Sequence, residues 1–177
     1  MLERALLDLM AERPLSDIGV SGLCWRAEVN RSTFYRHCGN PADVFREIED
    51  RAAGEIVSAL HEASAGTGLS LGLRVETICR YFQDRPPLAH ALFAYPNEPS
   101  HLIAALFEES TLPASTKDVQ RLFVSEVPTD RLLATFLMQG IYSLIRQWIA
   151  DGEPISPEEL GRLSEKIAFE GWASVLR

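Results

Sequence analysis

The sequence has little cysteine, and its three cysteines are far apart: Cys24, Cys38 and Cys79. They form no CxxC pair and no Cys/His spacing of the kind that binds zinc. Each lies on a predicted apolar helix face, so we interpret all three as small buried residues, with a redox-sensing pair of Cys24 and Cys38 as the alternative. We therefore predict no metal site and no cofactor.

Long apolar runs, repeats, low-complexity segments and a signal peptide are also missing. No apolar run approaches the ~18–20 residues that cross a bilayer, so we expect no membrane segment and a cytoplasmic protein. The motifs HExxH, GxSxG and the P-loop do not occur. The adjacent pairs Glu108-Glu109 and Glu158-Glu159 diverge on a helix. Since no nucleophile is paired with a base, we expect that the protein is not an enzyme.

Positive charge is scarce, with 17 Lys and Arg against 25 Asp and Glu and a net charge of −8. An acidic chain is not expected to bind polyanions over its whole surface. The exception is the segment of residues 21–38, where three Arg face a single Glu. This local reversal of sign allows a small basic surface.

Apolar residues recur at helical spacing through the chain, and a hydrophobic content of 46% suffices for a packed core. Asn40-Pro41 and Ser156-Pro157 are typical helix starts. We predict an all-α protein. Its expected helices span residues 2–12, 21–28, 31–37, 41–62, 69–83, 88–94, 98–109, 117–125, 129–149 and a last segment from 157.

Residues 20–38 are predicted to form two short helices joined by a tight turn. Asn30 favours the N-cap position of the second helix, because its side-chain oxygen can accept from a backbone N–H. Phe34 and Cys38, four residues apart, share one side of that helix. The other side carries only hydrogen-bond donors, which suit a polyanion: Arg31, Ser32, Thr33, Tyr35, Arg36 and His37.

The motif Ala27-Glu-Val29 with Arg31-Ser-Thr-Phe-Tyr-Arg-His37 resembles the helix-turn-helix of the TetR family of bacterial transcription regulators. Ile18-Gly-Val20 before it and the acidic helix start near Asp43 extend the resemblance, which is close over residues 2–45. It implies an N-terminal three-helix DNA-binding domain at 1–45 and a C-terminal helical domain for ligand binding and dimerisation at 46–177. Such a regulator is a repressor that binds a palindromic DNA operator as a homodimer and is released by a small-molecule effector.

The resemblance also implies roles for single residues. Tyr35 and His37, helped by Thr33, would contact phosphates, whereas Arg31, Ser32 and Arg36 would reach base edges. Ser21 and Asn30 complete the predicted DNA-binding set. The alternatives are a solvated surface charge for Arg36 and packing on the first helix for Tyr35.

Four positions depart from the family pattern, and at one of them Gly19 stands where the family often has Thr. Glu28 stands where the family has Gly, so a non-Gly residue must take the turn, with a positive φ as one outcome. Pro41 replaces a Lys and Cys38 replaces a Phe. Because Glu28 adds a negative charge and Pro41 removes a cation, we expect weaker and more salt-sensitive DNA binding than is usual for the family.

The last two long helices have apolar outer faces, which indicates a four-helix interface between two copies. A dimer would hold two reading helices one DNA turn apart, ~34–36 Å.

The C-terminal part is also expected to enclose a small-molecule cavity. The candidates are all aromatic or histidine residues, and each aromatic has a core position as its alternative. They are Tyr81, Phe82, His90, Phe93, Phe107, Phe136 and Trp148. For His90 and His101 we favour a surface position over a metal-binding role. A second hypothesis for the whole chain is a helical protein–protein interaction module with a degenerate helix-turn-helix.

Overall fold

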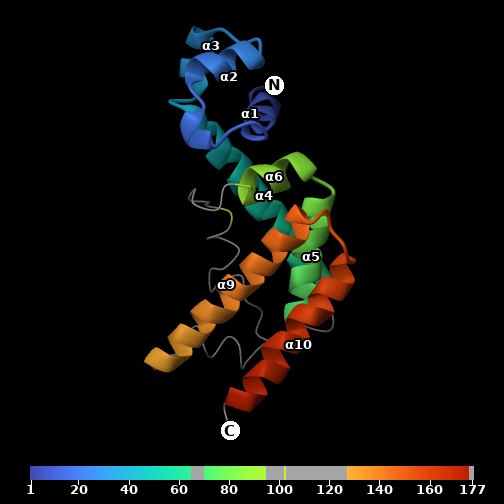
Figure 1. Ribbon diagram of the computed structural model, residues 1–177. Helices are drawn as coiled ribbons and strands as arrows, with labels where there is room; N and C mark the ends of the chain where they lie inside the picture. The colour runs from blue at the N-terminus through green and yellow to red at the C-terminus, as the bar shows by residue number, and fades with distance from the viewer. Residues whose placement is uncertain (65–69, 95–101, 103–126, 176–177) are drawn as a thin grey trace.

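The computed structural model describes residues 1–64, 70–94, 102 and 127–175, and in this part of the chain every regular element is a helix (Figure 1). The predicted all-α class is confirmed. The elements are α1 (Leu2–Met10), the 3-10 turn η1 (Leu15–Asp17), α2 (Val20–Arg26), α3 (Arg31–His37), α4 (Pro41–Ala63), α5 (Leu71–Gln83), α6 (Pro86–Phe93), α9 (Pro128–Ala150) and α10 (Pro157–Val175).

The first three helices form a small head at one end of the molecule, and α4 leads away from it (Figure 1). Helix α4 begins with a capping box. The Asn40 side chain accepts from the backbone N–H of Asp43 at 3.0 Å, and the Asp43 carboxylate accepts from the Asn40 N–H at 3.0 Å. Pro41 occupies the first turn, where its missing N–H costs nothing. The residues that signalled this helix start in the sequence therefore make the expected contacts.

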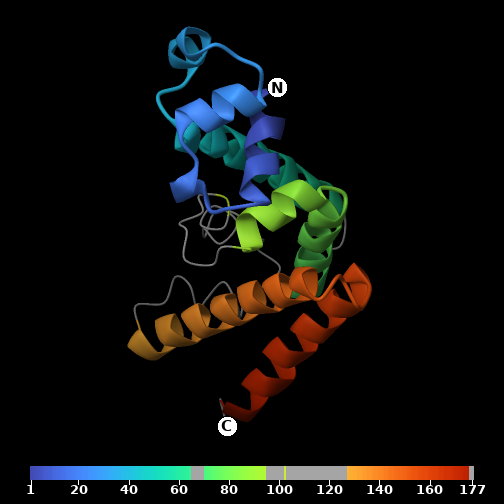
Figure 2. The same cartoon turned by 45° about the horizontal axis from the view of Figure 1, so that its top comes forward.

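The body contains α5, α6, α9 and α10, and α10 packs along α5. These two helices approach closely where Gly72 faces Gly161: a Cβ atom on Gly161 would overlap the backbone oxygen of Gly72. From their connection near α5, α9 and α10 spread apart (Figure 2). The Ser156 hydroxyl accepts from the Glu159 N–H at 3.2 Å and so caps α10 as predicted.

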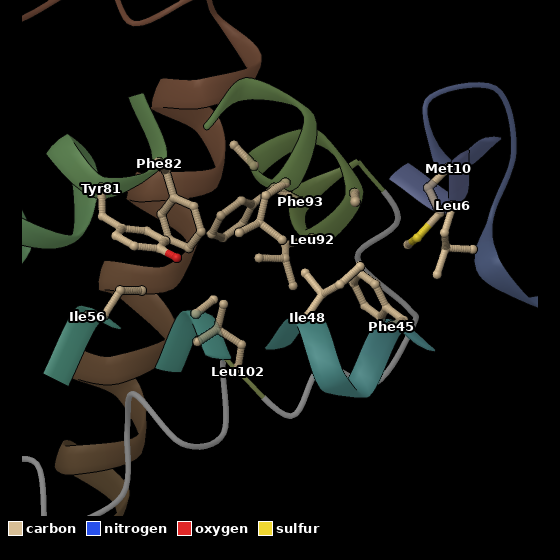
Figure 3. Close-up of a cluster of buried hydrophobic side chains, with 14 of the residues drawn as sticks. Leu6, Met10, Phe45, Ile48, Ile56, Tyr81, Phe82, Leu92, Phe93 and Leu102 are labelled. Carbon is tan, nitrogen blue, oxygen red and sulfur yellow. The ribbon is translucent and has the colours of Figure 1, made fainter. Parts of the chain in front are cut away.

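One apolar core runs from the head into the body (Figure 3). Leu6 and Met10 of α1 lie beside Phe45 of α4. Further along the same core, the rings of Phe82 in α5 and Phe93 in α6 meet edge to face at 5.2 Å. Helix α4 runs through this core and continues past residue 45 without a break. The domain boundary expected at residue 45 therefore stays a prediction.

Most predicted helices are present with shifted ends. Helix α3 has its predicted bounds, whereas α6 begins at Pro86 instead of Leu88, because proline is well accommodated in a first helical turn. The predicted helices 98–109 and 117–125 lie outside the described residues, except for Leu102. In the part of the chain that the structure describes, no helix combines the length and the apolar character needed to cross a bilayer.

Candidate nucleic-acid interface

Helix α2 ends in a turn in which one residue has the left-handed backbone conformation. Glu28 has a φ of 54°, so this non-Gly residue does take the positive φ that its position suggested. The Val29 N–H donates to the Cys24 carbonyl at 3.0 Å, and the Glu28 N–H to the Trp25 carbonyl at 3.3 Å. This pair of bonds is a Schellman motif, which ends α2 and sets the angle at which α3 begins.

Helix α3 is held by its apolar side and open on the other. Phe34 is fully buried and Cys38 nearly so. Tyr35 is 59% exposed, and its ring and the Phe34 ring meet edge to face at a centroid distance of 5.5 Å. Thr33 is half-buried. The remaining predicted contact residues of this helix are exposed: Arg31, Ser32, Arg36 and His37.

Asn30 is the N-cap residue of α3, but its side chain makes no capping hydrogen bond, so that part of the prediction is wrong. Its backbone carbonyl accepts from the Phe34 N–H at 3.0 Å. The helix is held without this bond by the burial of Phe34. The exposed Asn30 amide is left on the surface beside Arg31.

Ser21 and Arg31 bring α2 and α3 together, because the Arg31 guanidinium donates to the Ser21 hydroxyl. Both residues are exposed. No carboxylate among the described residues lies within ion-pair distance of Arg31 or Arg36. By contrast, Arg26 faces the carboxylates of Asp8 at 4.0 Å and Glu12 at 3.6 Å on α1. Among the arginines of α2 and α3, Arg31 and Arg36 of α3 are therefore the ones without a carboxylate partner in the described part of the chain.

The end of α3 is fastened to the start of α4. The Asp43 carboxylate accepts from the backbone N–H of Gly39 at 2.9 Å and from that of Asn40.

Burial raises the pKa of the Cys38 thiol, and the nearby Glu47 and Asp43 carboxylates raise it further. Cys24 and Cys38 are both buried free thiols, which favours the structural interpretation over a redox pair.

The seven candidates for a small-molecule cavity do not share one environment. Phe82, Phe93 and Trp148 are buried, and Figure 3 shows the first two in the common core. Tyr81 is 9% exposed and its hydroxyl donates to Glu55 at 2.9 Å. Burial is the main reason that its pKa rises to about 12.

Two of these candidates are exposed, which is not expected of residues that line an internal cavity. His90 is exposed on α6, and Phe136 is 76% exposed on α9. Helical periodicity places Phe136 with other apolar residues, but it does not tell an inner face from an outer one. Phe107 lies outside the described residues. A cavity among these side chains stays a prediction.

The outer faces of α9 and α10 carry large apolar side chains in contact with solvent. They are Leu132 at 71%, Phe136 at 76%, Leu163 at 41% and Ile167 at 53% exposure. This agrees with the expectation of apolar outer faces on the last two helices.

Trp25 is a further exposed residue of the head, and it does not belong to the DNA-binding set predicted from the sequence. It is 80% exposed on α2, one turn after Ser21. Its spacing of four from Ser21 was the available signal, because residues four apart share a helix face.

The arrangement of a three-helix head on a helical body occurs in known proteins. A TetR-like transcriptional regulator from Rhodococcus sp. RHA1 is 19% identical, with a TM-score of 0.66 over 97% of this chain and 93% of that one. A regulator from Syntrophomonas wolfei that is assigned to the TetR family is 16% identical, with a TM-score of 0.64 over 94% and 90%. The chain has the fold of TetR-family transcriptional regulators.

Sequence comparison adds one relative. The uncharacterized HTH-type transcriptional regulator YxbF of Bacillus subtilis is 26% identical over 170 residues, covering 91% of this chain and 42% of that protein. The chain thus spans less than half the length of this curated relative. No family model matches the chain.

Proposed function

We propose that the protein is a transcription regulator of the TetR family that binds double-stranded DNA through α3. The observation that carries this proposal is the geometry of that helix. Its apolar side is buried through Phe34, and its outer side presents exposed donors, with Arg31 and Arg36 unneutralised within the described residues. A helix of this kind fits the major groove, where side chains reach phosphates and base edges together.

The roles divide between phosphate and base contacts. Tyr35, Thr33 and His37 hold the register on the backbone, and Ser32 and Arg36 reach base edges. Because Arg31 is bonded to Ser21, these two side chains act as one unit across α2 and α3. Asn30 adds an exposed amide at the start of the helix.

The protein acts as a homodimer that reads a palindromic operator. The exposed apolar residues of α9 and α10 support this assembly, since burying them against a second copy removes apolar area from water. We also propose the division into a DNA-binding part at 1–45 and an effector-binding and dimerisation part at 46–177. The protein works in the cytoplasm, has no enzymatic activity, and a small-molecule effector releases it from DNA as a repressor.

The test is a selection of bound duplexes from a random library, followed by titration of the selected duplex at several salt concentrations. A protein with ~6–10 phosphate contacts loses about 10³–10⁵-fold in affinity between 50 and 200 mM salt. We expect retention of a palindrome and a loss of this order. Weak binding that ignores salt, or none, would favour the alternative of a protein–protein interaction module with a degenerate helix-turn-helix.

Two variants separate the roles. Tyr35→Ala should weaken binding to all duplexes alike, whereas Arg36→Ala should lower the preference at one base pair of each half-site by about 1–3 kcal/mol. Arg80→Ala is the matched control, because Arg80 lies on α5 and pairs with Glu76 at 2.9 Å. If Arg80→Ala alters DNA preference as much as Arg36→Ala does, the assigned reading face is wrong.

A further inference from the structure

Trp25 is a large aromatic residue that the fold leaves in solvent. Its side chain is 80% exposed, and no hydrogen bond joins its indole N–H to another of the described residues. Trp148 has the environment that is usual for a tryptophan: its side chain is 3% exposed, and its indole N–H donates to the Ile155 carbonyl at 2.8 Å. Exposed aromatic surface with a free polar handle is typical of contact sites.

The position of Trp25 continues the candidate interface. It follows Ser21 by four residues on α2, so the two side chains lie on one face of that helix. Trp25 and Asn30 both line a hollow of about 570 Å³ at the helix-turn-helix. Trp25 thus lies between two residues of the DNA-binding set, Ser21 before it and Asn30 after it.

The charges around Trp25 determine what kind of contact it can make. Arg26, its neighbour in the hollow, is engaged with Asp8 and Glu12 on α1. Glu28, which also lines the hollow, is negative. Arg26 is the one cation among the described residues that line the hollow, so a phosphate held there is bound mainly by neutral donors.

We propose that Trp25 is a further DNA-contacting residue, whose indole N–H donates to a phosphate oxygen while its ring covers the adjacent deoxyribose. The indole N–H is a donor only, which suits a phosphate oxygen. The contact lies outside the base edges, so it adds affinity without adding sequence preference. This inference rests on the proposed DNA-binding function.

The test compares Trp25→Ala and Trp25→Phe with the wild type on the selected duplex. Trp25→Ala should lower affinity roughly tenfold for each copy of the dimer, on specific and non-specific duplexes alike, as expected for the loss of a hydrogen bond to a charged group. The slope of log K against log salt should not change, because a neutral side chain releases no counterion. Arg36→Ala should instead reduce that slope by about one for each copy.

Tryptophan fluorescence gives a second readout. Duplex should shift and quench the emission of the exposed Trp25, and this change should be missing from Trp25→Phe, which keeps an aromatic ring but has no indole. The difference between the two proteins isolates Trp25 from the other tryptophans. Because Trp25→Phe replaces an exposed residue, this comparison also holds if Trp25→Ala folds poorly.

The outcomes separate the inference from the function on which it rests. Unchanged affinity in both variants, with a duplex-induced emission change that Trp25→Phe retains, would overturn the inference and leave the DNA-binding function intact. It would point to a protein partner at this hollow. Failure of the wild type to retain any duplex would overturn the proposed function itself.

Discussion

At the scale of single residues, Glu28 has a backbone conformation that suits glycine. An L-residue in the left-handed region is disfavoured by roughly 1–2 kcal/mol. Glu28 tolerates it because the Schellman bonds to Cys24 and Trp25 require a positive φ at this position. The turn that positions α3 is thus built with some strain, and it adds a negative charge near the proposed DNA surface.

Glu28→Gly should relieve this strain. We expect an increase of about 1 kcal/mol in the free energy of unfolding, or roughly 2–4 °C in Tm for a protein of this size, measured by thermal denaturation. DNA affinity should rise as well, since a carboxylate is removed. Glu47→Gly is the control: it removes an exposed carboxylate from within α4 and should destabilise by about 1 kcal/mol. Equal effects of the two substitutions on stability would contradict this account of the turn.

The cysteines offer a second prediction at this scale. Burial is the main reason that the pKa of Cys79 rises to about 12, and it also raises the pKa of Cys38. Because the thiolate is the reactive form, a shift from 9.0 to about 12 lowers its fraction at pH 8 about a thousandfold. A thiol reagent should therefore label the folded protein slowly and label three cysteines quickly after denaturation. Rapid labelling of Cys24 and Cys38 in the folded protein would restore the redox interpretation.

At the scale of elements, α5 and α10 depend on two glycines. The backbone oxygen of Gly161 is 3.0 Å from where a Cβ atom of Gly72 would lie, so the two helix backbones are nearly in contact. The Ser70 hydroxyl also donates to the Glu165 carboxylate at 3.3 Å across the same pair of helices. This crossing fixes the place of α10, and through it part of the expected dimer surface.

Gly161→Ala should separate α5 and α10 and destabilise the protein by about 1–3 kcal/mol, because the new methyl group meets backbone that does not yield easily. Gly54→Ala is the matched control, since nothing lies within 4 Å of its Cβ position on α4. That substitution should stabilise the helix by up to ~1 kcal/mol. Denaturant titration measures both, and a neutral Gly161→Ala would show that the crossing is looser than the structure indicates.

The helices also show how much of the structure could be predicted from the sequence. Helix α3 and the cap at Asn40 were predictable, because short-range signals such as Phe34–Cys38 spacing and Asn-Pro-x-Asp act within one turn. The exposure of Trp25 and Phe136 was not predictable, since periodicity reveals an apolar face without revealing what covers it. The missing Asn30 cap bond was also not predictable, because the residue type favours this bond without fixing the side-chain conformation that makes it.

At the scale of the whole molecule, α9 and α10 have more apolar surface than a single chain covers. Leu132 and Phe136 lie one helical turn apart on the outer face of α9, and Ile167 adds to it from α10. In a monomer these side chains would remain in water. The proposed dimer would bury them and would also space two copies of α3 along the duplex.

Leu132→Asp combined with Phe136→Asp should convert the dimer to a monomer, because it places charge in an apolar interface. Sedimentation velocity at micromolar concentration should show the change. Trp25→Asp is the control, since it places the same charge at an exposed apolar site on the head and should leave the dimer intact. A wild-type protein that sediments as a monomer, or a double variant that remains dimeric, would exclude α9 as the dimer surface.

The head and the body share one core, so α3 is held at a defined angle to the dimer surface. Met10 of the head and Leu92 of α6 lie in the same apolar cluster (Figure 3). Two copies joined through α9 and α10 would therefore present α3 in a fixed geometry. The operator should consist of two half-sites at one set spacing, and insertion of half a turn of DNA between them should abolish tight binding.

The central claim, that two copies of α3 read one duplex, is tested most directly by hydroxyl-radical footprinting on the selected operator. Two linked copies of α3 should protect two patches about 10–10.5 bp apart, ~34–36 Å along the axis, related by the symmetry of the palindrome. In Tyr35→Ala both patches should weaken together and require a higher protein concentration. A single patch, a spacing that two linked copies of α3 do not match, or protection that Tyr35→Ala leaves unchanged would contradict the claim.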